Sequence, residues 1–358
     1  LLENGLNQSL DPRMEKLVRL NLAASLIFCE DLDKAEFEIR TLLKKFGHES
    51  VHLRLMGTLL QAQIDLHINQ VERAQKTLLE LKNSTAKESG APQLLIEKWL
   101  AIANFRLDPN TIHRQRIDDL RATLRKAQQW ETLRGLDMEV ALASNDERLG
   151  ARLYYGTPFP SVRRRLGQSA LGPLLPAPYL LYDHRAEQLP TKIIDGLTGE
   201  NMPFKFGSLQ YRGVLHLLSD FYQPWTVYKI FNGLFNDQAF DVVHSLQRVY
   251  QLMRRIGVDC DGVKVPLNLT TTRNGYRLRP TSEGGVLLYE KMSFPDVESL
   301  IHQILKTKIG GARHFSTREI ARYTPLSERQ AQRVVHQLAA DGRIETINDA
   351  RKNRRYQI

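Results

Sequence analysis

The amino-acid sequence predicts a mostly α-helical protein with small β-hairpins, in the α+β class. Apolar residues recur at three- and four-residue spacing from Pro12 to about Asn145, which is typical of amphipathic helices. Two later stretches, 266–278 and 344–358, carry the pattern of two short strands around a polar turn. The predicted organisation is a helical repeat over 1–148, a connector over 149–178, and two domains of helices and a hairpin over 179–280 and 281–358.

The distribution of charge separates the two halves of the chain. The 358 residues hold 50 Lys and Arg against 40 Asp and Glu, which gives a net charge of +10. Counted by segment, the net charge is −1 over 1–150, +4 over 151–300 and +7 over 301–358. This excess of cations predicts a polyanionic partner for the second half, and charge alone fits DNA, RNA or an acidic membrane surface.

Composition also narrows the class of protein. No run of 18 apolar residues occurs, so we expect no membrane-spanning segment and no membrane partner. The two cysteines, Cys29 and Cys260, have no neighbours at metal-ligand spacing and cannot form a disulfide framework. This cysteine usage favours two reduced thiols in a cytoplasmic protein.

The first predicted domain consists of helices of about 15 to 20 residues joined by short loops, so that neighbours run antiparallel. We expect the breaks between them at Asp31, Gly47-His48, Asn69, Ser89-Gly90 and Asp108-Pro109. Two segments echo each other, one around Ala35 and one around Ala74, which lie 39 residues apart. The stretch resembles a tetratricopeptide-type array, and the resemblance implies an input or assembly module whose concave surface binds a peptide or protein.

Between about 150 and 208, glycines and prolines interrupt the helical pattern, and we expect no helix to run through them. Residues 179–183 and 192–194 read as short strands joined by a turn. The triplet Arg163-Arg164-Arg165 lies in the connector and is either a solvated run of charge or a phosphate clamp.

Three helices are predicted next, over Ser208–Phe221, Thr226–Phe235 and about Asp241–Ile256. On the third helix, apolar residues at 3, 4, 3 spacing predict the buried face: Val242, Leu246, Val249, Met253 and Ile256. The opposite face carries the candidate contact residues His244, Gln247, Arg248, Gln251, Arg254 and Arg255. A strand over 266–272, the turn Arg273-Asn274-Gly275 and a returning strand then close the unit as a hairpin.

Three helices closed by a β-hairpin predict a winged helix, and residues 179–279 resemble the OmpR-type winged-helix output domain of response regulators. The resemblance implies that the third helix enters the major groove of duplex DNA, with Gln247, Arg248 and Gln251 at base-reading positions. It also implies that Thr272 and Arg273 in the hairpin contact phosphate or the minor groove. In that family a phospho-acceptor domain usually precedes the winged helix, whereas a helical repeat takes its place here.

A second, smaller unit follows the same plan. Ser316 and Glu319 form a capping box before a helix that ends at Tyr323, and Ser327 caps a helix that ends near Ala340. On that second helix Ala331, Val334, Val335 and Leu338 are predicted to point inward, and Arg329, Gln332, Arg333, His336 and Gln337 to point outward. Strands over 344–348 and 354–358 make a hairpin whose basic residues are Arg351, Lys352, Arg354 and Arg355. This unit resembles the winged helix-turn-helix of bacterial repressors.

The residue types on these two helices suit the reading of DNA bases. Arginine can donate two hydrogen bonds to guanine O6 and N7, and glutamine can pair with adenine N6 and N7. A basic hairpin adds phosphate contacts, which supply affinity without sequence information. The sequence therefore predicts a sequence-specific, double-stranded-DNA-binding transcription regulator, and whether it is a homodimer stays open. The alternative is a scaffold whose repeats and winged helices bind only proteins.

Other patterns in the sequence bear on whether the protein is an enzyme or stacks nucleic-acid bases. His48-Glu49-Ser50-Val51-His52 matches the HExxH zinc-protease motif, but Gly47 predicts that His48 lies in a turn, off the helix the motif needs. The chain contains no GxxxxGK[ST] or GxGxxG phosphate loop and no GxSxG elbow. Four aromatics between Tyr222 and Phe231 have core spacing, although they could also form a stacking platform. We therefore expect a protein that is not an enzyme and that has neither a metal nor a cofactor.

Overall fold

A computed structural model describes residues 11–85, 91–183, 189–196, 201–202, 204, 208–235, 240–261, 266–289, 315–323, 328–342, 344–348 and 354–357. The chain divides into two compact units, one comprising 1–153 with 159–174, the other 154–158 with 175–358. Within the described residues the protein is mostly helical, with small sheets of two or three strands. The predicted class, mostly α with a small β component, is confirmed.

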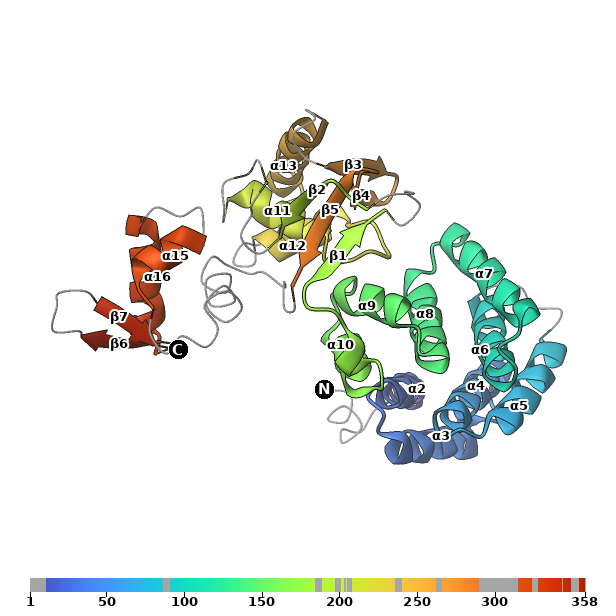
Figure 1. Ribbon diagram of the computed structural model, residues 1–358. Helices are drawn as coiled ribbons and strands as arrows, with labels where there is room; N and C mark the ends of the chain where they lie inside the picture. The colour runs from blue at the N-terminus through green and yellow to red at the C-terminus, as the bar shows by residue number, and fades with distance from the viewer. Residues whose placement is uncertain are drawn as a thin grey trace. The chain divides into compact units, whose positions relative to one another are not determined.

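Among the described residues of the first unit, the helices α2 to α8 follow one another along a curved array, drawn from blue to green in Figure 1. Their bounds are α2 (Pro12–Phe28), α3 (Leu32–Phe46), α4 (Val51–His67), α5 (Val71–Ser84), α6 (Ala91–Leu107), α7 (Thr111–Lys126) and α8 (Trp130–Ser144). The predicted breaks at Asp31, Gly47-His48, Asn69 and Asp108-Pro109 each fall between two of these helices, and the one at Ser89-Gly90 lies outside the described residues. One further break, at 127–129, was not predicted. Gln128 has a φ of 56° there, and a glutamine in a sequence does not usually indicate this left-handed conformation.

The predicted echo of Ala35 and Ala74 corresponds to equivalent positions in α3 and α5, and both side chains are fully buried. The three- and four-residue spacing that predicts α2 as a helix does not identify its core face. Leu17 and Ala24 are exposed, and the core face of α2 runs instead through Leu22, Ala23, Leu26 and Ile27. Because apolar residues occupy more than one side of this helix, three- and four-residue spacing alone could not select the side that packs.

Our expectation that no helix runs through the connector was wrong. Residues 149–178 contain most of α9 (Glu147–Tyr155), all of α10 (Pro160–Gln168) and the 3₁₀ turn η1 (Gly172–Leu174). Pro160 occupies the first turn of α10, where a missing N–H removes no helical hydrogen bond. Gly150 inside α9 faces the side chain of Leu171, and a Cβ there would lie 2.9 Å from a Leu171 methyl. The close approach of Leu171 therefore explains why a residue without a side chain occupies this position of α9.

In the second unit, β1 (Tyr179–Tyr182), β2 (Lys192–Asp195) and β5 (Gly284–Leu288) form a three-stranded sheet in the order β1-β5-β2. The strands predicted at 179–183 and 192–194 are present, and most of the turn predicted between them lies outside the described residues. β1 pairs antiparallel with β5, and β2 pairs parallel with β5. The central strand was not predicted, because it starts Gly284-Gly285, residues that are poor strand formers.

Three helices and a hairpin follow in the predicted order: α11 (Leu209–Leu217), α12 (Val227–Leu234), α13 (His244–Asp261), β3 (Leu267–Thr272) and β4 (Gly275–Pro280). The three helices pack on one another around Tyr211, Ile230 and Val249, each fully buried. The hairpin is attached to the start of α12, because the backbones of Trp225 and Tyr276 exchange two hydrogen bonds of 2.7 and 2.9 Å. The aromatics Tyr222, Trp225 and Phe231 are buried, whereas Tyr228 is exposed.

The last segment holds α15 (Thr317–Tyr323), α16 (Glu328–Ala340), β6 (Glu345–Asn348) and β7 (Arg354–Gln357). The predicted capping box is confirmed: the Ser316 N–H donates to Glu319 Oε2 at 2.7 Å, and the Glu319 N–H donates to Ser316 Oγ at 3.2 Å. The second predicted cap, Ser327, lies outside the described residues. Phe315 and Tyr356 join the hairpin to the start of α15 through paired backbone hydrogen bonds.

Candidate nucleic-acid interface

The face of α13 that carries the predicted contact residues is exposed to solvent. His244, Gln247, Arg248, Gln251, Arg254 and Arg255 are all exposed. The opposite face is buried through Val249, Met253 and Ile256, as predicted, and also through Ser245 and Leu252. Val242 was wrongly predicted to be buried, and its exposed fraction is 67%.

The side chain of Asp241 explains why Val242 lies outside the core. It accepts hydrogen bonds from the N–H groups of Val243 at 2.9 Å and His244 at 2.6 Å, so the helix begins three residues later than predicted. The hydrogen bond from the His244 backbone is the main cause of a lowered pKa for the Asp241 carboxyl. Val242 therefore precedes the helix and takes no part in its periodicity.

Arg248 differs from the other candidate residues on this helix. Its guanidinium lies 4.2 Å from the ring centroid of Phe235 and 6.0 Å from that of Phe231. This cation–π geometry places the guanidinium against the aromatic residues at the end of α12. Gln247 and Gln251, the other two residues at predicted base-reading positions, have no side-chain hydrogen bond within the described part of the chain.

The turn of the β3–β4 hairpin uses one of its two candidate residues internally. The Thr272 hydroxyl donates to the Gly275 carbonyl at 3.0 Å and accepts from the Asn274 N–H at 3.2 Å. Gly275 has a φ of 130°, and a Cβ there would lie 2.1 Å from the Trp225 carbonyl oxygen. Thr272 thus stabilises the turn, and Arg273 at its tip is the exposed cation.

The C-terminal segment repeats the division into two faces. On α16, Ala331, Val335 and Leu338 are fully buried and Val334 is half-buried, as predicted. The outward residues Arg329, Gln332, Arg333, His336 and Gln337 are all exposed. Arg354 and Arg355 lie on β7, opposite Asn348 and Ile347 of β6. Arg351 and Lys352 lie outside the described residues.

Sequence reasoning missed two exposed residues beside the predicted contact row. Val243, just before α13, and Tyr250, within it, are 60% and 50% exposed. Their apolar character made them look like core residues. Their spacing of four, three and four residues places them on the solvent side of α13 together with Gln247 and Arg254, and this spacing was the signal that could have found them.

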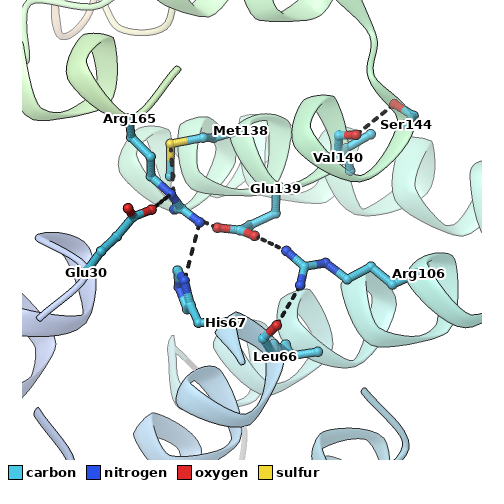
Figure 2. Close-up of polar contacts among 9 residues, drawn as sticks. All are labelled: Glu30, Leu66, His67, Arg106, Met138, Glu139, Val140, Ser144 and Arg165. Carbon is cyan, nitrogen blue, oxygen red and sulfur yellow. Dashed lines mark hydrogen bonds and ion pairs between the residues drawn. The ribbon is translucent and has the colours of Figure 1, made fainter. Parts of the chain in front are cut away.

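The first unit holds a cluster of buried charge that the sequence did not indicate (Figure 2). Glu139 of α8 accepts from Arg106 Nη2 at 2.7 Å and from Arg165 Nη1 at 2.8 Å, and the Arg165 Nε also pairs with Glu30 at 2.8 Å. Burial raises the pKa of the Glu139 carboxyl, but the two guanidiniums outweigh burial and hold its pKa below the usual value. Arg165 is therefore neither a solvated charge nor a phosphate clamp, and its role is to tie α10 to α8 and to the end of α2.

The local structure at the HExxH match does not suit a zinc site. His48 lies in the turn after α3, and His52 lies in the first turn of α4, whose cap is Ser50 with a hydrogen bond from the Leu53 N–H. Glu49 forms an ion pair with Lys16 of α2. Within the described ranges no group of three His, Cys, Asp or Glu residues is arranged to hold a metal ion.

Comparison with known proteins returned no relative: no family model matches the chain, and no curated protein matches it. Over the described parts of the chain, every helix is too short or too polar to cross a membrane.

Proposed function

We propose that this chain is a sequence-specific, double-stranded-DNA-binding transcription regulator that acts in the cytoplasm. In this proposal the winged-helix domain of the OmpR type, expected over 179–280, extends to Leu288 because β5 joins β1 and β2, and the later residues up to 358 form a second winged helix-turn-helix domain. The helices α13 and α16 are the recognition helices, and the β3–β4 and β6–β7 hairpins are the wings.

The observation that carries the proposal is the two-faced character of α13 and α16. Each helix buries one apolar row and exposes a row of arginine, glutamine and histidine, five such residues on α16 and six on α13. Arginine and glutamine are the side chains that make bidentate hydrogen bonds to guanine and adenine in the major groove. A helix followed by a hairpin also matches the way such domains place one element in the groove and one on the flanking backbone.

The charge of the chain supports a nucleic acid as the partner. The net charge of +7 falls on the 58 residues of 301–358, and the 150 residues before them carry +4. Cations at this density favour phosphate contacts, which release counterions and make affinity depend steeply on salt. The helical unit, with a net charge of −1 over 1–150, then serves as the input or assembly module, with a peptide or protein as its ligand.

A mobility-shift assay on genomic fragments, repeated across salt concentrations, tests the proposal. We expect a shift whose affinity falls as a steep power of the salt concentration. Arg333→Ala on the exposed face of α16 should weaken binding by about 5- to 150-fold, the range of one bidentate base contact. Arg125→Ala, at an exposed position of α7, is the matched control and should leave affinity unchanged.

Two results would contradict the proposal. A protein-only scaffold, the alternative class, produces no shift at any salt concentration. Equal losses from Arg333→Ala and Arg125→Ala would show that the exposed face of α16 is not the DNA-binding surface.

A further inference from the structure

The helical unit contains a buried lysine, Lys98, that has no part in the proposed DNA binding. Lys98 lies on α6 and is only 7% exposed. Its ammonium lies 4.4 Å from the ring centroid of Trp99. No carboxylate lies within ion-pair distance of Lys98 among the residues the structure describes. A buried ammonium without an anion is unfavourable, so its presence in this core needs a reason.

The neighbouring carboxylate, that of Glu139, already pairs with two other cations. The two carboxylate oxygens of Glu139 are taken separately, Oε2 by Arg106 and Oε1 by Arg165 (Figure 2). Arg106 also donates to the Leu66 carbonyl at 2.8 Å, and its Nε is buried without a hydrogen-bond partner in the described part of the chain. Glu139 therefore leaves Lys98 without a direct counter-ion.

The glycine at position 135 explains why no side chain of α8 serves as the counter-ion of Lys98. Gly135 of α8 faces Lys98, and a Cβ there would lie 2.6 Å from the Lys98 ammonium nitrogen. Gly135 and Glu139 are four residues apart on α8 and so share one face. The helix thus presents a carboxylate to the arginines and no side chain to the lysine.

From this arrangement we propose that Lys98 is the anchor of a small-molecule site in the helical unit, and that its ligand is a small organic carboxylate. The carboxylate would accept hydrogen bonds from the ammonium, and the Trp99 ring would give the organic part an apolar surface. A side chain that is 7% exposed suits a compact anion rather than a polypeptide. The site does not depend on DNA binding and would be where a metabolite acts on the regulator.

The protonation of Lys98 gives this site a distinctive signature. Burial lowers the pKa of Lys98 to about 8, with the charge of Glu139 opposing this shift and that of Arg165 adding to it. Arg165 also lies beside Glu30 and His67, and burial lowers the pKa of His67 as well. A bound carboxylate would raise the pKa of Lys98, so binding near pH 8 should take up about half a proton per site.

Calorimetry and thermal unfolding of the full chain with sodium propionate, at constant ionic strength, test the proposal. We expect propionate to raise the melting temperature by about 2 °C or more at saturation. At pH 8 the binding enthalpy should vary with the ionisation enthalpy of the buffer, by the amount that proton uptake requires. Inorganic phosphate is the comparison probe, and a response to phosphate without a response to propionate would overturn the carboxylate assignment.

Three variants make the test specific to Lys98. Lys98→Met keeps the length of the side chain, removes the charge and should abolish both effects. Its own stability should equal or exceed that of the wild type, because a buried charge without a partner is removed. Gly135→Ala displaces the ammonium while keeping its charge, and should weaken propionate binding. Lys126→Met, at an exposed position of α7, is the control and should behave as the wild type.

The proposal fails if wild type and Lys98→Met respond equally to propionate, or if neither responds. Both outcomes are independent of the mobility-shift assay, so the carboxylate site and the DNA-binding function can fail separately.

Discussion

Two pairs of arginines, one pair in each half of the chain, are used in opposite ways. In the helical unit, Arg106 and Arg165 converge on one buried carboxylate. On the helices of the second half, Arg254 and Arg333 are exposed and pair with no carboxylate among the described residues. Where arginines have internal partners they stabilise packing, and where they lack them they remain available to an external anion. A count of arginines therefore says less about nucleic-acid binding than the location of their partners does.

The largest expected effect on this comparison comes from breaking the buried ion pairs of the helical unit. Glu139→Ala leaves two buried guanidiniums without their shared counter-ion, and we expect it to lower the free energy of unfolding by about 3–5 kcal/mol. Urea unfolding followed by circular dichroism measures this loss. Glu72→Ala, at an exposed position of α5, is the control and should change stability by no more than about 0.5 kcal/mol. A small effect of Glu139→Ala would show that the buried pairs do not stabilise the unit.

The same carboxylate predicts how stability depends on pH. Because the folded-state pKa of Glu139 lies below the unfolded value of 4.5, its contribution is complete above that value and is lost as the pH falls through the folded pKa. Acid titration of the folded chain should show this loss. In Glu139→Gln the corresponding slope should be absent, and an unchanged acid profile would assign the slope to other carboxyls.

A smaller effect, on DNA discrimination, is expected from the exposed face of α13. Gln251→Ala removes one predicted adenine contact and should reduce discrimination between the preferred and mismatched DNA by about 1–3 kcal/mol. The free energy of unfolding should not change, because the side chain is exposed. Competition binding with matched and scrambled duplexes measures the first quantity. If affinity fell equally for both duplexes, Gln251 would be a backbone contact and not a base contact.

The smallest effect is expected from the hairpin tip. Arg273→Ala should weaken binding about equally for all sequences and lower the slope of log affinity against log salt by about 1. Thr272→Val offers a contrast, since Thr272 is used by the turn itself. It should act through the stability of the hairpin and leave the salt slope unchanged. A Thr272→Val variant with a lower salt slope would restore Thr272 as a DNA contact.

Much of the fold could be predicted from local patterns, and the failures have physical causes. Asn69 marks a helix end because asparagine tolerates the left-handed conformation found there, whereas glutamine at the break at Gln128 gives no such signal. Pro160 was taken as a helix breaker although it stands at a first turn, where proline is accepted. The exposed rows of α13 and α16 followed directly from periodicity.

Contacts between distant residues could not be predicted in this way. The pairing of Arg165 with Glu139 and Glu30 joins residues 26 and 135 positions apart, and nothing in a triplet of arginines specifies which member turns inward. Lys98 likewise sits among apolar residues on α6, and its lack of a counter-ion depends on Gly135 in another helix. Side-chain chemistry can be read from the sequence, but the partners of a side chain depend on tertiary packing.

The central position of β5 determines when the sheet of the second unit can form during synthesis. β1 and β2 lie about 100 residues before the strand that joins them, and that strand comes after both α13 and the β3–β4 hairpin. During synthesis from the N-terminus, the two outer strands emerge first and have no neighbour to bond to until residue 288 has left the ribosome. We expect this sheet to close late, and a chain that stops at Pro280 to leave two open strand edges prone to pairing with other molecules.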